Sequence, residues 1–133
     1  MWRTTSKSKA KDRILLVDDE PDIVYLVKRW LELNDFEVDA YVDPIMALQK
    51  FKSDLYQLLL LDIKMPKMDG IELFNRIEKE DDEAKVCFFT ASEHLASIYK
   101  KLFQNSPDRF LFVSKPISIS EMTKQIKQFL KIR

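Results

Sequence analysis

Short apolar runs alternate with segments of helical period five times along this chain. Continuous apolar runs cover residues 14–17, 58–61, 86–89 and 110–113, and residues 36–42 are β-rich and partly alternating. Runs of this length are typical of strands, and continuous ones indicate strands that are covered on both faces. Five strand-helix units predict an α/β fold with a doubly wound, mostly parallel five-stranded sheet. Each crossover is right-handed and must bury its apolar stripe, so helices are expected on both faces.

Capping residues mark where the predicted helices begin. Pro21 suits the first turn of a helix that runs to Asn34, and Asp43-Pro44 is a cap followed by a first-turn residue. A weaker helical pattern covers residues 95–104, and Ser118 with Glu121 forms a capping box before the last helix. Helical spacing predicts these apolar faces: Ile23, Leu26, Val27, Trp30 and Leu33; Ile45, Leu48 and Phe51; Ile71, Phe74 and Ile77; Met122, Ile126 and Phe129.

Length and composition are typical of a single globular domain. The 133 residues suit one domain, and 46% hydrophobic with 33% charged residues is typical of a globular chain. Because 22 basic residues balance 22 acidic ones, net charge gives no pull toward nucleic acid. The longest apolar run is far shorter than the ~20 residues of a membrane helix, so we expect no membrane contact and a cytoplasmic location. Residues 1–12 are polar and basic and predict a flexible tail, which leaves residues 13–133 as the domain.

Polar residues stand where the predicted strands end. Asp18 and Asp19 follow the first strand, Asp62 follows the third, Thr90 the fourth, and Lys115 lies just beyond the fifth. Taken singly, each has an ordinary explanation, such as a carboxylate at a helix N-terminus or a helix cap. In a parallel sheet, however, the carboxyl ends of the strands meet at one edge, where ligands bind. We therefore expect these five side chains to share one site.

The chemistry of such a site follows from its charges. Two carboxylates ~4 Å apart repel by about 4 kcal/mol at an effective dielectric constant near 20. Three of them need a cation to stay ionised, and Mg²⁺ is the natural choice because it takes carboxylate, water and phosphate oxygens. An ionised Asp can then act as a nucleophile toward phosphorus, while a hydroxyl and a Lys hold the other phosphoryl oxygens.

Four motifs carry a family resemblance: ILLVDDE, LLLLDIKMPKMDG, FFTAS and FLFVSKP. In this order and spacing, the chain resembles the receiver (CheY-like) domain of two-component response regulators over about residues 12–130. The resemblance implies a flavodoxin-like sheet with strand order 2-1-3-4-5. It also implies that Asp62 accepts a phosphoryl group from a histidine kinase in a Mg²⁺-dependent reaction.

The resemblance assigns the remaining site roles as well. It implies that Asp19 binds Mg²⁺ directly and that Asp18 contributes through water or hydrogen bonds. The main-chain carbonyl of Lys64 completes the protein ligands. Thr90 is expected to hydrogen-bond the phosphoryl group.

On the same basis, Lys115 is expected to pair with the phosphoryl group, aimed at the site by a cis Lys115-Pro116 bond. Phe112 stands where the family places an aromatic switch residue. Such a domain is a signalling module that catalyses its own phosphorylation and slow autodephosphorylation.

The resemblance also names classes of partner. These are a sensor histidine kinase or a histidine phosphotransfer protein, and a downstream protein that contacts the face formed by the fourth helix, fifth strand and fifth helix. A phosphorylation-dependent homodimer stays open, and no direct nucleic-acid contact is expected. The chain, as given, holds no output domain, so it is either a stand-alone receiver or a piece of a longer regulator.

Two alternatives compete with an active receiver. A haloacid-dehalogenase-like phosphohydrolase also uses an Asp nucleophile and Mg²⁺, but it requires a second Asp two residues later, where this chain has Lys64. A degenerate receiver would bind partners without phosphorylation, and the complete set of site residues argues against it. Lys64 and Ser92 depart from the common pattern at positions that flank the hydrolysing water, and the long, cationic Lys64 predicts slow loss of the phosphoryl group.

Overall fold

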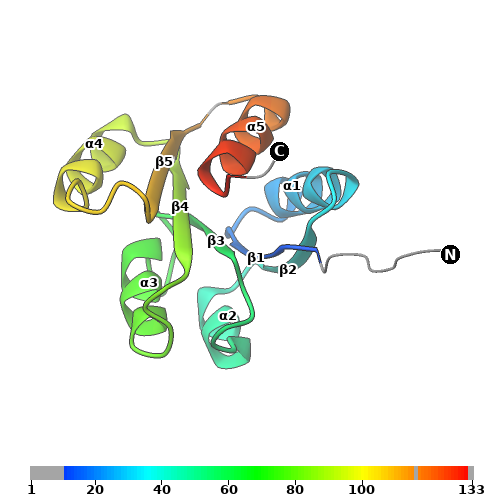
Figure 1. Cartoon of the computed structure of the whole chain (residues 1–133). Helices are drawn as coiled ribbons and strands as arrows, with labels where there is room; N and C mark the ends of the chain where they lie inside the picture. Colours follow the sequence, from blue (N-terminus) through cyan, green and yellow to red (C-terminus); the bar gives the residue numbers. More distant parts are fainter. Residues whose placement is uncertain (1–10, 116, 132–133) are drawn as a thin grey trace, which may run out of the picture.

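The five predicted strands and five helices are all present in the fold (Figure 1). A computed structural model describes residues 11–115 and 117–131. In chain order the elements are β1 Arg13–Val17, α1 Pro21–Leu33, β2 Glu37–Tyr41, α2 Pro44–Lys50, β3 Leu58–Asp62, α3 Gly70–Glu78, β4 Lys85–Thr90, α4 Glu93–Leu102, β5 Phe110–Ser114 and α5 Ile119–Phe129. Residues 1–10 of the expected tail, and Pro116 of the expected cis bond, lie outside the described residues.

The strands form one parallel sheet in the order β2-β1-β3-β4-β5, which confirms the predicted fold class and topology. Figure 1 shows α1 and α5 on one face of the sheet and α2, α3 and α4 on the other. The connections therefore change from one face to the other after β2, between α1 and α2, and change back after β5, between α4 and α5. The strand order reverses between β1 and β3, so the carboxyl ends of these two neighbours open onto a crevice where ligands bind in such sheets.

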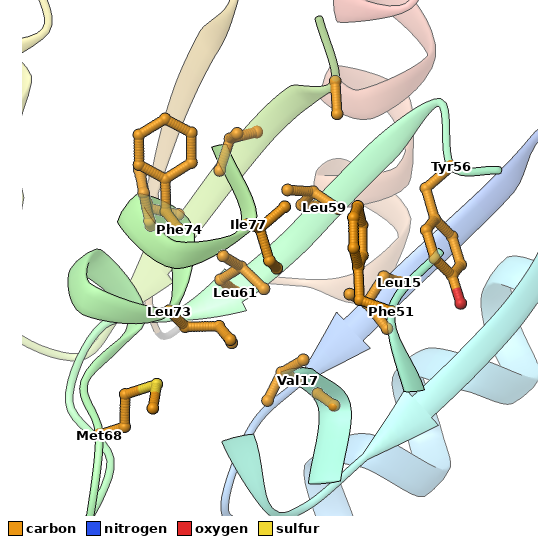
Figure 2. Packing of buried hydrophobic residues seen from close by; sticks show 14 of the residues in the cluster. Leu15, Val17, Phe51, Tyr56, Leu59, Leu61, Met68, Leu73, Phe74 and Ile77 are labelled. Carbon is orange, nitrogen blue, oxygen red and sulfur yellow. The ribbon is translucent and has the colours of Figure 1, made fainter. Parts of the chain in front are cut away.

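Two hydrophobic cores flank the sheet, and β3 contributes side chains to both. Leu58 and Leu60 belong to the core under α1 and α5, while Leu59 and Leu61 belong to the core under α2 and α3, where Figure 2 shows them among Leu15, Val17 and Ile77. All four leucines are fully buried, and each contributes about 1.5–3 kcal/mol relative to an exposed position. The strand that ends at Asp62 is thus held by a hydrophobic core on both of its faces.

The buried face of α1 differs from the predicted one. Val24, Val27 and Leu31 are buried, whereas Leu26, Trp30 and Leu33 are 51%, 39% and 72% exposed. Apolar residues occur almost all round this helix, so spacing alone does not decide which stripe faces the sheet. The packing of α1 beside α5 and β2 decides it.

Two other helices also depart from expectation. In α2, Pro44 and Ala47 are buried and Ile45 is 38% exposed; Phe51 is buried but lies at the C-cap, just outside the helix. The helix α4 begins two residues before the predicted start because the hydroxyl of Ser92 accepts a 3.1 Å hydrogen bond from the Leu95 N–H. These differences concern helix faces and ends and leave the topology unchanged.

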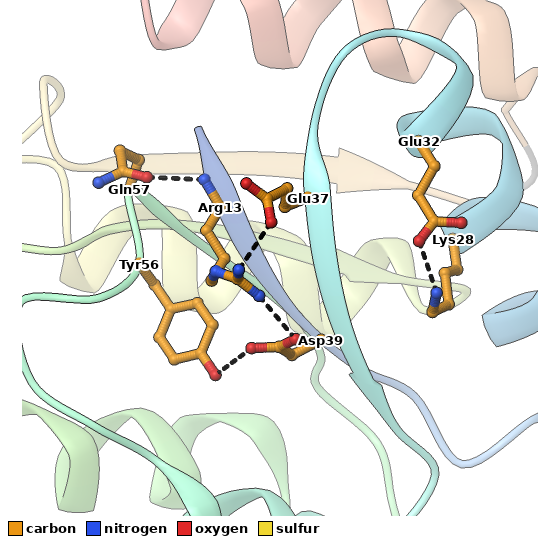
Figure 3. Close-up of polar contacts among 7 residues, drawn as sticks. All are labelled: Arg13, Lys28, Glu32, Glu37, Asp39, Tyr56 and Gln57. Carbon is orange, nitrogen blue, oxygen red and sulfur yellow. Dashed lines mark hydrogen bonds and ion pairs between the residues drawn. The ribbon is translucent and has the colours of Figure 1, made fainter. Parts of the chain in front are cut away.

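A polar network joins the amino ends of the strands, opposite the carboxyl ends where the candidate site lies (Figure 3). The guanidinium group of Arg13 lies 2.7 Å from Glu37 and 2.9 Å from Asp39. The buried Tyr56 donates its hydroxyl to Asp39 at 2.8 Å, and Gln57 accepts the Arg13 N–H at 2.7 Å. This network ties β1, β2 and the start of β3 together far from the candidate site.

Candidate functional site

A cavity of about 620 Å³ opens where β1, β3, β4 and β5 end. Its lining residues come from the ends of these strands and the loops after them: Asp19, Glu20, Asp62, Lys64, Met65, Pro66, Thr90, Ala91, Ser92 and Lys115. Four of the five side chains predicted to converge line this cavity, and the fifth, the fully buried Asp18, forms an ion pair with the lining residue Lys115. The predicted convergence is therefore confirmed.

Three carboxylates meet at the base of the cavity. Asp18 has no exposed surface, Asp62 is 5% exposed, and one oxygen from each of Asp18, Asp19 and Asp62 lies within 4.8 Å of the others. Burial, and next the charge of Asp18, raise the pKa of Asp62 to about 7, although Lys115 and the main-chain N–H of Lys64 act in the opposite direction. Such a site gains stability from any bound cation.

Lys115 supplies the positive charge that the carboxylates share. Its ammonium group lies 2.8 Å from Asp18, 3.6 Å from Asp62 and 3.6 Å from Glu20. Burial by itself lowers the pKa of Lys115, but the hydrogen bond to Asp18 and the charge of Asp62 outweigh burial and raise it above its ordinary value. One ammonium group cannot balance three carboxylates, so the cluster keeps a net negative charge.

The residues present fit a hard divalent cation. Their ligand atoms are carboxylate oxygens on the rigid ends of β1 and β3, the donors that Mg²⁺ prefers. The open cavity leaves room for water and phosphate oxygens in the remaining positions. This donor set, rather than any single Asp, is what makes the site a candidate metal centre.

Thr90 ends β4 beside this cluster and is 1% exposed. Its hydroxyl oxygen accepts a 3.2 Å hydrogen bond from the Ser92 N–H, which leaves the hydroxyl hydrogen available as a donor. The Lys115 N–H donates to the Thr90 carbonyl at 2.7 Å, so the ends of β4 and β5 are tied together at the site. A hydroxyl and an ammonium group are thereby held on fixed strand ends.

Phe112 lies away from the cavity, in a cluster of phenylalanines between the sheet and α3 and α4. Its ring centroid is 5.5 Å from that of Phe88 and 6.3 Å from that of Phe103. Phe112 is half-buried and pairs with Phe88 in the β4–β5 ladder, two residues before Ser114, the ladder partner of Thr90.

The sequence pattern did not single out Phe89, which also shapes the site. The ammonium group of Lys115 lies 4.6 Å from the centre of the Phe89 ring, a favourable cation–π distance. Phe89 directly precedes Thr90, so it points to the opposite face of β4. Only the strand alternation next to a recognised site residue could have indicated it.

Comparison with known proteins identifies the class. The family described as "Response regulator receiver domain" matches residues 14–127, so the chain belongs to that family. It is a receiver domain of two-component response regulators, a class of signalling domain that interacts with histidine kinases and downstream effectors. This membership does not support the phosphohydrolase alternative.

Individual relatives agree with this assignment. The transcriptional regulatory protein TrcR of Mycobacterium tuberculosis is 31% identical over 119 residues, which cover 90% of this chain and 45% of TrcR. TctD of Salmonella typhimurium is 30% identical over 90% of this chain and 52% of its own length. The chain therefore spans about half the length of these curated relatives.

Solved structures show the same fold. The response regulator TrrA of Thermotoga maritima, determined in complex with Mg(2+)-BeF, superposes with a TM-score of 0.73 at 31% identity, covering 89% of this chain and 98% of TrrA. A CheY-like receiver domain of Methanospirillum hungatei gives 0.78 at 28% identity, over 91% and 94% of the two chains. Within the part of the chain that the structure describes, no helix is long and apolar enough to span a membrane.

Proposed function

We propose that Asp62 is the phosphoacceptor of this receiver and that its partner presents a phosphohistidine. One observation carries the proposal: the buried Asp62 carboxylate lies among Asp18, Asp19 and Lys115 at the base of an open cavity. An oxygen of Asp62 attacks phosphorus, an O–P bond forms and the P–N bond of phosphohistidine breaks. The released imidazole nitrogen keeps the bonding electron pair and takes a proton from solvent.

The same carboxylates are suited to hold Mg²⁺. Asp19 and Asp62 would bind it directly, Asp18 through water or hydrogen bonds, and the main-chain carbonyl of Lys64 is the proposed further ligand. When bound, Mg²⁺ supplies positive charge that keeps Asp62 ionised and neutralises the incoming phosphoryl oxygens. The Mg²⁺-containing complex of TrrA, a relative with the same fold, supports this assignment.

Two residues of the chain would stabilise the transferred group. The Thr90 hydroxyl has a hydrogen available to donate to one phosphoryl oxygen. Lys115 would exchange its resting partner Asp18 for another phosphoryl oxygen, since its ammonium group already lies 3.6 Å from Asp62. The same two residues would assist phosphorylation of Asp62 by a small-molecule donor and the slow autodephosphorylation that follows. The domain would therefore catalyse its own modification.

The output would be a shift between two conformations. Movement of Thr90 toward the phosphoryl group would make room for Phe112 to turn inward and alter the face of α4, β5 and α5. Ile98 and Leu102 of α4 are 40% and 67% exposed on that face, whereas Tyr99 and Phe103 contact the core. We propose this face as the contact for a downstream protein or a second phosphorylated copy, in the cytoplasm.

Phosphorylation of the purified chain tests the proposal. The protein is incubated with Mg²⁺ and acetyl phosphate, and intact mass is measured before and after acid treatment and in excess EDTA. We expect gain of one acid-labile phosphoryl group in the wild type, loss of this gain in Asp62→Ala, and loss with EDTA. A wild type that gains no phosphate, or an Asp62→Ala variant that gains as much, would favour the phosphorylation-independent binding module.

A further inference from the structure

Gly70, the first residue of α3 and the only glycine of the chain, lies against the main chain of the proposed phosphoacceptor. A Cβ atom at Gly70 would stand 2.1 Å from the carbonyl oxygen of Asp62, 3.0 Å from its carbonyl carbon and 3.1 Å from the Cα atom of Ile63. Contacts under 3.0 Å essentially never occur for a Cβ atom, and the atoms met are backbone atoms. Any side chain would have to push the two segments apart by about 0.9 Å.

This close approach closes the loop between β3 and α3. The Gly70 N–H donates to the Ile63 carbonyl at 2.8 Å, so the beginning of α3 is bonded to the residue after Asp62. Asp69 caps the same helix end, since its carboxylate accepts the Glu72 N–H at 2.8 Å. The two ends of the loop therefore meet at the main chain of Asp62.

The interior of the loop is packed as well. Met65 and Met68 are 8% and 7% exposed and belong to the core under α2 and α3. The Met68 N–H donates to the Pro66 carbonyl at 2.8 Å, and Lys67 adopts a φ of 71°. The loop is closed by the Gly70–Ile63 hydrogen bond and anchored by Met65 and Met68. A displacement at Gly70 would therefore be passed on to the end of β3.

We propose that Gly70 is a positioning residue for Asp62: its missing side chain lets α3 rest on β3 and so fixes the Asp62 carboxylate and the Lys64 main chain against Asp18 and Asp19. The proposal rests on the proposed function of Asp62 and deepens it. Reactive groups must be held within ~0.5 Å of their productive geometry, which is less than the displacement that a Cβ atom would impose. Asp62 has little freedom to relax elsewhere, because it pairs with Phe89 in the ladder and is 5% exposed.

The variant Gly70→Ala tests this role with two readouts. Mg²⁺ affinity is measured by following amide signals of the site in NMR titrations, and phosphorylation rate is measured with acetyl phosphate at saturating Mg²⁺. We expect Mg²⁺ binding ~10-fold weaker and phosphorylation slower by up to ~100-fold. The control is Ile77→Ala, a cavity at a fully buried position of the same helix; it lowers stability and is expected to keep both values within twofold of the wild type.

A second variant serves if Gly70→Ala does not fold. Asp69→Ala removes the cap of α3 without adding atoms. Its control is Ile77→Val, which should lose about as much stability as Asp69→Ala does and less than Ile77→Ala. We expect Asp69→Ala to weaken Mg²⁺ binding severalfold and Ile77→Val to leave it unchanged. Wild-type Mg²⁺ affinity in both loop variants, or equal losses in the Ile77 controls, would overturn the positioning role. A wild type that binds Mg²⁺ but gains no phosphate would instead refute the proposed function, and the comparison of Mg²⁺ affinities would still decide the role of Gly70.

Discussion

The ammonium group of Lys115 donates a 2.8 Å hydrogen bond to the carboxylate of Asp18, which has no exposed surface, and stands 3.6 Å from Asp62. The two residues are 97 positions apart in sequence, and their pairing ties the end of β5 to the end of β1. In the resting site, Lys115 therefore holds Asp18 rather than the proposed phosphoacceptor. In the proposed reaction, Lys115 would have to leave Asp18 to contact a phosphoryl oxygen on Asp62.

Replacing Lys115 by Ala should make the fold depend on divalent cations. Without the ammonium group, three crowded carboxylates remain, one of them fully buried, and loss of one partner of a buried pair costs about 3–5 kcal/mol. Urea unfolding in EDTA should show a loss of this size, and saturating Mg²⁺ should restore much of it. Equal stability of wild type and Lys115→Ala in EDTA would contradict this view of the pair.

Asp62→Asn should stabilise the metal-free protein at high pH and not at low pH. The folded pKa of Asp62, about 7, is above its ordinary value of 3.8, so the folded state binds the proton more tightly than the unfolded state. Wild-type stability therefore falls as pH rises from 3.8 to about 7, and the variant escapes this loss. We expect the variant to gain about 4 kcal/mol at pH 8 in EDTA, because a pKa of about 7 in the folded state against 3.8 in the unfolded state corresponds to ~4 kcal/mol.

Unfolding at pH 4 and in Mg²⁺ provides the controls for Asp62→Asn. At pH 4 the Asp62 carboxyl is protonated in the folded state, so the advantage of the variant should nearly vanish. Mg²⁺ at pH 8 should stabilise the wild type more than the variant and narrow the gap. An advantage that is independent of pH would point to packing rather than charge.

Lys64→Asn should shorten the lifetime of the phosphorylated protein. Lys64 lines the cavity beside Asp62, where a long, cationic side chain can shield the phosphoryl group or pair with it. We expect severalfold faster autodephosphorylation, measured as decay of the phosphorylated mass after donor removal. Lys67→Asn is the matched control, because Lys67 belongs to the same loop but lies 3.7 Å from Asp43, outside the cavity lining. Slower hydrolysis in Lys64→Asn would refute the idea.

Beryllium fluoride with Mg²⁺ should shift the NMR signals of the Phe112 ring and of α4 in the wild type. Phe103 stacks on Phe110 at 4.3 Å and lies 6.3 Å from Phe112, so it links the proposed switch residue to the C-terminal end of α4. Phe103→Leu should cost about 1–2 kcal/mol of stability through lost aromatic contacts. It should also reduce the α4 shifts while leaving those near Asp62. Unchanged Phe112 and α4 signals in the wild type would contradict the switch.

Lys67→Gly should stabilise the fold by about 0.5–1 kcal/mol, because Lys67 adopts a φ of 71° that costs an L-residue energy and suits glycine. Asp35→Gly, at a φ of 70°, should gain less, since Asp tolerates this conformation better than Lys does. Urea midpoints of the two variants and the wild type decide the matter. A loss of stability in Lys67→Gly would show that the Lys67–Asp43 ion pair outweighs backbone strain.

The topology and the convergence of site residues could be predicted because both follow from order along the chain. Apolar runs that end at Asp18, Asp62 and Thr90 define strand ends, and parallel strands bring these ends together whatever the helices do. The cap at Ser118 was visible for the same reason, since its hydroxyl accepts a bond from Glu121, only three residues away. Helix caps and the order of the strand ends can therefore be predicted from residues that are close together in the sequence.

The buried face of α1 and the polar contacts outside the candidate site could not be predicted in this way, although the predicted faces of α3 and α5 are confirmed by the burial of Phe74, Ile77, Met122 and Ile126. Leu26 and Trp30 fit an apolar stripe as well as Val24 and Leu31 do, and only the neighbouring α5 and β2 select between them. The Tyr56–Asp39 hydrogen bond joins β2 to the loop before β3 across 17 positions of sequence, and nothing in either residue's sequence neighbours indicates the other. The need for glycine at position 70 likewise arises from a backbone contact that spacing does not reveal.

The unequal burial of β3 and α4 sets different rates of amide hydrogen exchange at the two ends of the signalling path. Every residue of β3 is buried, so its amides should exchange only when the whole domain unfolds. In α4, Ala96 is the one buried residue, and local opening should expose its amides far more often. The phosphoryl group would then be attached to the slowest-exchanging strand of the domain and detected by partners through its most readily opened helix.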